Sequence, residues 1–147
     1  MLTQLIAKSE EELMMIESMF SIWFVAGVFG GLLNAVFVWV TGRFGINRAI
    51  GLAVKPDWTT GFLYNKLVWG GIWGVLFYFV GKSYPITLYP AFLVSLAPTA
   101  VQLFYIFPLM AKKGFAGKDL GRFTWAYVIV SNLVWAVGAY GWFKSSI

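Results

Sequence analysis

Four amide side chains, one in each long apolar stretch of the sequence, are the first candidates for a functional role: Asn34, Asn65, Gln102 and Asn132. An amide both donates and accepts hydrogen bonds, and leaving one unpaired in an apolar environment is costly. We therefore expect these side chains to face inward and to bond one another or bare backbone carbonyls. They would serve either as polar links between helices or as part of a ligand or substrate site.

The residue types on which most catalytic sites depend are missing. The chain has no histidine and no cysteine, so it lacks the commonest general base near neutral pH and all thiol chemistry. Its six carboxylates lie in the N-terminal segment and the loops. We therefore predict a protein that is not an enzyme, with no catalytic residue, metal or cofactor, and no nucleic-acid partner.

The overall composition predicts a membrane protein. Of the 147 residues, 60% are apolar and only 12% are charged, and the mean hydropathy is +0.76. Soluble domains are typically about 45–50% apolar and about 25% charged. A soluble domain of this size could not hide so much apolar surface, because small domains bury only about two thirds of what the unfolded chain exposes.

Charge-free stretches mark the expected membrane spans, because charges are costly in hydrocarbon and a crossing helix needs roughly 20 apolar residues. They predict a single membrane domain over residues 1–147, an all-α bundle of four transmembrane helices at about 21–41, 61–81, 86–110 and 123–143. The spans are expected to be helices because a barrel strand would alternate in polarity, and these stretches do not.

An acidic N-terminal extension, residues 1–20, precedes the first span. Ser9 with Glu12 three residues later matches a capping box, which predicts a helix that begins there and runs directly into the first span. The extension would be either a solvated helix end or an arm that docks on a partner.

The positive residues predict the orientation in the membrane. Eight of the 11 Lys and Arg residues lie in or beside two long loops: Arg43, Arg48, Lys55, Lys66, Lys112, Lys113, Lys118 and Arg122. Such an excess is typical of the cytoplasmic side. We therefore expect both long loops in the cytoplasm, and both termini and the short Ser83–Pro85 turn outside.

Two GxxxG pairs, Gly27 with Gly31 and Gly70 with Gly74, are typical of helices whose backbones approach closely. Helical rise places both pairs at a similar depth. This favours an antiparallel contact between the first and second spans, and a homodimer face is the alternative.

Prolines interrupt the third span. Pro98 and Pro108 lie in its interior and are expected to bend it by freeing the carbonyls of Val94 and Phe104. Three polar side chains lie close enough in the sequence to satisfy these carbonyls: Ser95, Thr99 and Gln102. Broken helices often line transport sites, although bent helices also occur without any transport role.

Three of the amides lie at a similar depth. By helical rise, Asn34, Gln102 and Asn132 lie about 9–14 Å from the cytoplasmic ends of their spans, and Asn65 is shallower. We predict that these three converge on one polar layer close to the carbonyl freed by Pro98.

The loops and the one basic residue inside a span have simple interpretations. Phe44–Val54 is either a short interfacial helix that Pro56 ends or an ordered loop. Gly114–Gly121 lacks the glycine and hydroxyl spacing of a phosphate-binding loop and is predicted to be a flexible turn. Lys66, near the end of its span, is expected to reach toward the interface.

Three apolar segments carry a resemblance to a known group of proteins: Leu67–Gly74, Ser95–Leu103 and Asn132–Trp135. They resemble segments of small bacterial four-helix inner-membrane proteins of uncharacterised function, and the resemblance spans about residues 61–143. It implies a four-span fold in a bacterial inner membrane, and it brings no activity and no catalytic residue.

These observations favour a non-catalytic integral membrane protein that is an accessory or structural subunit of a larger membrane complex. Its partners would be the lipid bilayer and other membrane subunits, or further copies of itself. The alternative is an oligomeric transporter or channel for a small molecule or a lipid, because four helices are few to enclose a pore alone.

Overall fold

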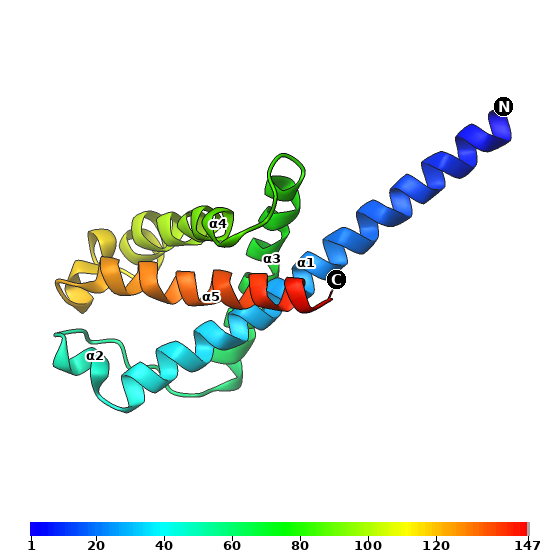
Figure 1. Ribbon diagram of the computed structural model, residues 1–147. Coiled ribbons are helices and arrows are strands. Elements are labelled where there is room, and N and C mark those ends of the chain that lie inside the picture. Colours follow the sequence, from blue (N-terminus) through cyan, green and yellow to red (C-terminus); the bar gives the residue numbers. More distant parts are fainter. Residues whose placement is uncertain (147) are drawn as a thin grey trace.

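The computed structural model describes residues 1–146, and every regular element in this range is a helix (Figure 1). In chain order these are α1 (Leu2–Arg43), α2 (Ile46–Ala49), α3 (Thr60–Gly81), α4 (Leu88–Val101), the π-helix η1 (Gln102–Met110), the 3-10 helix η2 (Phe115–Leu120) and α5 (Thr124–Ser146). The all-α class predicted from the sequence is confirmed.

Three helices are long and apolar enough to cross a membrane: α1, the continuous segment Leu88–Met110, and α5. These helices are compatible with the membrane protein that the composition predicts. The second predicted span corresponds to α3, which is 22 residues long. Asn65, Lys66 and several glycines lower its average hydropathy below that of the other three.

Helix α1 runs without interruption over 42 residues and begins at Leu2. The prediction that it begins at Ser9 is therefore wrong. Ser9 lies inside the helix, where its hydroxyl donates a hydrogen bond to the Ile6 carbonyl at 2.7 Å. The preceding residues include leucine, glutamine, alanine and lysine, which all favour helix, so the helix continues back past Ser9. Figure 1 shows this N-terminal part of α1 projecting well beyond the other helices.

Helices α1 and α3 run antiparallel and touch at their glycines. A Cβ atom on Gly70 would lie 2.6 Å from the Gly27 carbonyl oxygen and 2.9 Å from the Gly31 Cα. A Cβ on Gly74 would lie 2.8 Å from the Gly27 Cα. Only glycine leaves room for backbones to approach this closely. The structure thus brings both GxxxG pairs into one contact within the chain.

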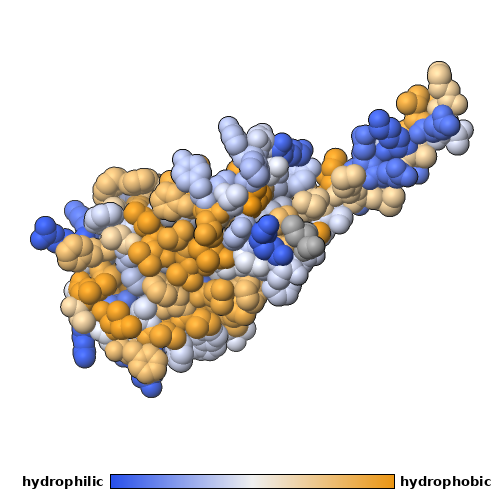
Figure 2. All heavy atoms as spheres, viewed as in Figure 1, coloured by the Kyte–Doolittle hydropathy of each residue, from blue (hydrophilic) through white to orange (hydrophobic). Residues whose placement is uncertain are grey.

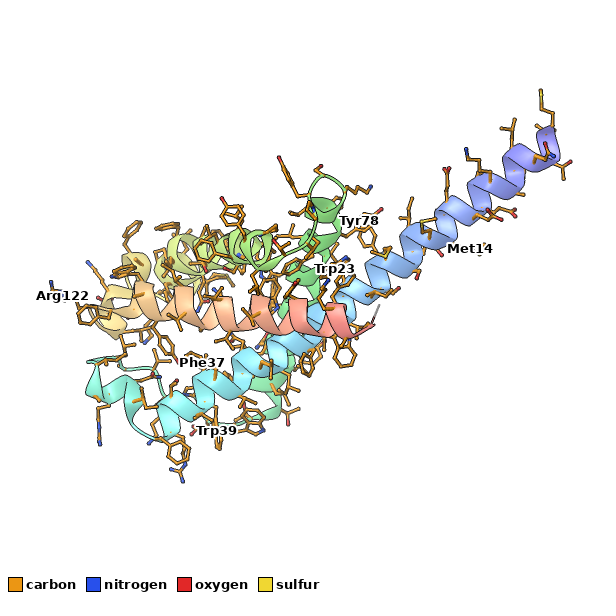
Figure 3. The ribbon with its side chains drawn as sticks, in the orientation of Figure 1. Met14, Trp23, Phe37, Trp39, Tyr78 and Arg122 are labelled. Atoms are coloured by element: carbon orange, nitrogen blue, oxygen red, sulfur yellow. The ribbon has the colours of Figure 1, made fainter. Side chains whose placement is uncertain are left out.

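Helix α5 packs across this pair through aromatic rings. Trp23 of α1 lies between Phe77 of α3, with ring centroids 4.9 Å apart, and Phe143 of α5, 3.7 Å apart. Figure 3 shows Trp23 where α1, α3 and α5 meet. Trp135 of α5 also donates from Nε1 to the Gly27 carbonyl at 3.1 Å. These contacts fix α5 against the glycine crossing.

The segment from α4 to η1 changes its winding between the two interior prolines. It is α-helical through Val101, with Pro98 inside, and continues as a π-helix that contains Pro108. Proline has no N–H to donate, so it interrupts the regular ladder of helix hydrogen bonds. A wider π turn is a common way to accommodate such an interruption.

The hydroxyls beside Pro98 bond to carbonyls other than the one that we expected. Ser95 donates to Phe92 at 2.6 Å, and Thr99 donates to Ser95 at 2.8 Å. A hydroxyl has one proton to donate, so neither can also serve the Val94 carbonyl that Pro98 frees. The reason is reach: each hydroxyl bonds a carbonyl three or four residues earlier on its own helix.

The two long loops meet at one end of the molecule. The Ala53 N–H donates to the Leu120 carbonyl at 2.7 Å. In the first loop only α2 is helical, and the rest is an ordered non-helical segment. In the second loop, the segment predicted to be a flexible turn contains the 3-10 helix η2, and Gly114, Gly117 and Gly121 all adopt positive φ.

Candidate functional site

A pocket of about 290 Å³ lies among the four long helical segments. Residues of α3 form one side, residues of α4 and η1 form the other, and α1 and α5 form the floor. Its polar lining consists of all four amides and one lysine: Asn34, Asn65, Lys66, Gln102 and Asn132. The four amides singled out in the sequence therefore line one pocket, but Asn65 is exposed, so the expectation that all four face inward is wrong for that residue.

The amides bond to neighbours other than one another. Asn34 Nδ2 donates to the Ser131 carbonyl of α5 at 2.5 Å. Asn132 Nδ2 donates to Thr99 Oγ1 of α4 at 3.0 Å. Among residues 1–146 no hydrogen bond joins Asn34, Gln102 or Asn132 directly. Two of the three amides of the predicted polar layer are thus bonded to neighbouring helices, Asn34 to α5 and Asn132 to α4.

The side-chain oxygen of Asn34 has no hydrogen-bond donor among the described residues. Asn34 is only 3% exposed, and its Oδ1 is buried without a partner. The orientation of the amide is fixed, because its nitrogen faces the Ser131 carbonyl, which can only accept. A buried acceptor without a donor is rare in folded proteins and needs an explanation.

Lys66 is the only charged residue that lines the pocket. Its side chain is half-buried, and its Nζ lies 5.9 Å from the centre of the Phe62 ring, one turn earlier on α3. No carboxylate lines the pocket with it. The pocket therefore combines a positive charge with amide groups that can form further hydrogen bonds.

The remaining walls are apolar and aromatic. Trp69 and Trp73 come from α3, Val101 and Ile106 from α4 and η1, and Trp135 from α5. Such a lining, with a few convergent polar groups, is typical of sites that bind small organic molecules. The pocket can bind by hydrogen bonding, charge and apolar contact.

The predicted structural residues lie around this pocket. Gly31, Gly70 and Pro98 line it directly. Gly27 and Gly74 belong to the adjoining helix crossing, and Pro108 lies beyond it in η1. The glycines thus set the spacing of α1 and α3 at the floor of the pocket.

Sequence reasoning missed a second buried polar cluster. Thr41 Oγ1 and the Tyr127 hydroxyl are 2.7 Å apart, and Asn47 Nδ2 lies 3.3 Å from the same hydroxyl. Asn47 also donates to the Val54 carbonyl at 2.7 Å. The cluster joins α1, the first loop and α5. No local pattern marks it, because its members are far apart in the sequence.

A second cavity, of about 770 Å³, lies at the loop end of α1. Arg43, Arg48 and Lys55 line it together with backbone of the first loop. All three belong to the positive residues used to predict orientation.

The chain was compared with known proteins in three ways. No protein-family model, no curated protein and no solved structure matches it.

Proposed function

We propose that this chain is a non-catalytic integral membrane protein with four spans that acts as an accessory or structural subunit of a larger membrane complex. The resemblance of its apolar segments favours a bacterial inner membrane. The observation that carries the proposal is an uncovered apolar stripe on the projecting part of α1.

The meeting of the two loops supports α3 as the fourth span. The first loop follows α1, the second follows η1, and the Ala53–Leu120 hydrogen bond places both at the same end. If α1 and Leu88–Met110 each cross the membrane toward that end, α3 must return to the other side before α4 begins. Its 22 residues are long enough to do so.

The N-terminal arm, residues 2–18, carries the apolar stripe. Leu2, Leu5, Leu13 and Ile16 fall within a narrow sector at 100° per residue and are all exposed. Phe20 continues the same face and packs on Tyr78 of α3 with ring centroids 4.4 Å apart. Beyond that point α3 ends and nothing within residues 1–146 covers the stripe.

The chemistry of the arm indicates the kind of partner. Glu10, Glu11, Glu12 and Glu17 lie beside or opposite the stripe, and Figure 2 shows hydrophilic and hydrophobic residues side by side on this part of the molecule. A partner helix with an apolar stripe flanked by basic residues would match both features. The arm is expected on the outer face of the membrane, opposite the basic loops.

Purification in mild detergent followed by intact-complex mass analysis tests the proposal. We expect a foreign subunit in a fixed stoichiometric ratio with the chain. Leu13→Glu with Ile16→Glu should abolish its co-purification, because both changes place charge on the stripe. Met15→Glu is the control: Met15 is also exposed but lies about 120° around the helix from the centre of the stripe. A homo-oligomer without any foreign subunit would contradict the proposal.

The pocket favours a second candidate, an oligomeric transporter or channel for a small molecule or a lipid. It lies between helices and contains polar groups where α4 changes to a π-helix. This candidate predicts that the purified chain alone, in liposomes, moves a solute or a labelled lipid across the bilayer.

A further inference from the structure

We propose that the pocket binds the head group of an anionic phospholipid that carries a hydroxyl, such as phosphatidylglycerol. In this arrangement Lys66 pairs with the phosphate, and the Asn34 side-chain oxygen accepts a hydrogen bond from the hydroxyl. The proposal rests on the four-span placement and is independent of any partner of the N-terminal arm.

The pocket opens sideways, toward the position of the lipid. Trp69 on the α3 side is 54% exposed, and Val101 on the opposite side is 38% exposed. The floor is closed, since Asn34 and Trp135 are each only 3% exposed. Trp69 lies in the middle of α3, and Val101 is the last residue of α4, from which the helical segment continues as η1 to Met110, so both lie away from the loops. A molecule entering between them therefore comes from the bilayer.

Depth and charge select the head group of a lipid. Lys66 is six residues after Thr60, the start of α3, which is about 9 Å by helical rise and close to the expected interface. A half-buried lysine in apolar surroundings, with no carboxylate in the pocket, favours an anion. Anionic lipids are attracted to basic residues on the cytoplasmic side, where the orientation places this end of α3.

The orphaned oxygen of Asn34 adds a second requirement. A phosphate diester has no proton to donate, so charge pairing with Lys66 alone would leave this acceptor unsatisfied. A hydroxyl on the head group supplies the missing donor once the neighbouring side chains shift to admit it, because this oxygen has almost no accessible surface. The volume of about 290 Å³ lies near the lower end for ligand pockets, roughly 300–1,000 Å³. This volume suits the head group of a lipid, and the acyl chains of that lipid would remain outside the pocket, against Trp69 and Val101.

Native mass spectrometry of the full-length chain in detergent, titrated with single lipids of identical acyl chains, tests this inference. Phosphatidylglycerol should bind one site roughly fivefold or more tightly than phosphatidylcholine, the factor expected for one lysine. Phosphatidylmethanol, which keeps the charge but lacks the hydroxyl, should bind at an intermediate level. Equal binding of phosphatidylglycerol and phosphatidylcholine would overturn the proposal, and equal binding of phosphatidylglycerol and phosphatidylmethanol would remove the role of Asn34.

Substitutions at two lysines of the same chain distinguish lipid binding at this pocket from a general attraction of the lipid to positive charge. Lys66→Gln should abolish the preference for phosphatidylglycerol. Lys66→Arg keeps the charge and should retain the preference, which shows that a substitution at this position does not itself unfold the chain. Lys82→Gln removes the same charge just beyond the other end of α3 and should leave binding unchanged. Equal losses at Lys66 and Lys82 would overturn the site.

Free inorganic phosphate distinguishes a lipid from a soluble anion. Millimolar phosphate should not displace phosphatidylglycerol, because the apolar mouth of the pocket is reached from the bilayer. Complete displacement would overturn the assignment to a lipid. The four-span placement is tested separately by cysteine labelling, so a chain that inserts as proposed but shows no lipid preference would contradict this inference alone.

Discussion

Gly31 and Gly70 lie in the close crossing of α1 and α3, and a larger side chain at either position must separate two backbones. A Cβ on Gly31 would collide with the Lys66 carbonyl oxygen, and one on Gly70 with the Gly27 carbonyl. We predict that Gly31→Leu or Gly70→Leu destabilises the chain by about 1–3 kcal/mol, as overpacking does. Thermal unfolding in detergent measures this loss.

Gly141→Leu is the control for this substitution. Nothing lies within 4 Å of a Cβ at Gly141, so the same change in size on α5 should leave the melting temperature nearly unchanged. The close crossing of α1 and α3 is wrong if the Gly31 and Gly70 variants melt like the parent chain.

The hydrogen bond from Asn132 to Thr99 is the only side-chain pair that ties α5 to α4 within the polar layer of the described chain. A double-mutant cycle of Asn132→Leu and Thr99→Val should give a coupling of about 0.6 kcal/mol and no more than about 1.7 kcal/mol, the range for such bonds between membrane helices. Unfolding by denaturant in detergent measures the cycle. Strict additivity of the two substitutions would show that the bond contributes nothing.

At the scale of the elements, the buried hydroxyl of Tyr127 holds the first loop against α1 and α5. Tyr127→Phe leaves Thr41 and Asn47 without this shared partner, at a cost of about 1–3 kcal/mol. We expect faster amide exchange in the loop, most clearly at Leu52 and Ala53. Tyr64→Phe removes a hydroxyl from an exposed tyrosine and should change nothing. Unaltered loop exchange in Tyr127→Phe would contradict the role of the cluster.

The helices could be predicted from the sequence because the signals for them are local. The predicted span at 61–81 corresponds to α3, Thr60–Gly81, because Lys82 and the loop before Thr60 bound a largely apolar stretch in which Lys66 is the only charged residue. The start of α1 was missed because a capping box marks where a helix can begin and does not exclude an earlier start.

The partners of the site residues could not be predicted, because they depend on how each helix is rotated about its axis. Depth alone places Asn34 and Asn132 at one level. The glycine crossing and the packing of Trp135 then turn Asn34 toward the Ser131 carbonyl. The π-helix that begins at Gln102 changes the rotation of that side chain relative to an α-helix. Neither effect has a local signature in the sequence.

At the scale of the whole molecule, the four-span arrangement predicts which parts share a side of the membrane. The chain has no cysteine, so a single introduced cysteine reports on one position. Cysteines replacing Lys55 and Lys118 should resist an impermeant thiol reagent in intact cells, and one replacing Ser83 should react. The reverse pattern would contradict the orientation, and different reactivity of the two loop positions would contradict the number of spans.

Because α1 is unbroken and long enough to cross a membrane, it also fixes the distance between its two ends. Its 42 residues extend about 63 Å, roughly twice the 30 Å thickness of the hydrocarbon core. A partner bound near Leu2 would therefore stand at a set height and a set rotational angle relative to the glycine crossing. Seven inserted residues would raise that height by about 10 Å while turning the bound face by only about 20°. Two inserted residues would turn it almost fully away. Height and facing are thus separately adjustable by the length of one helix.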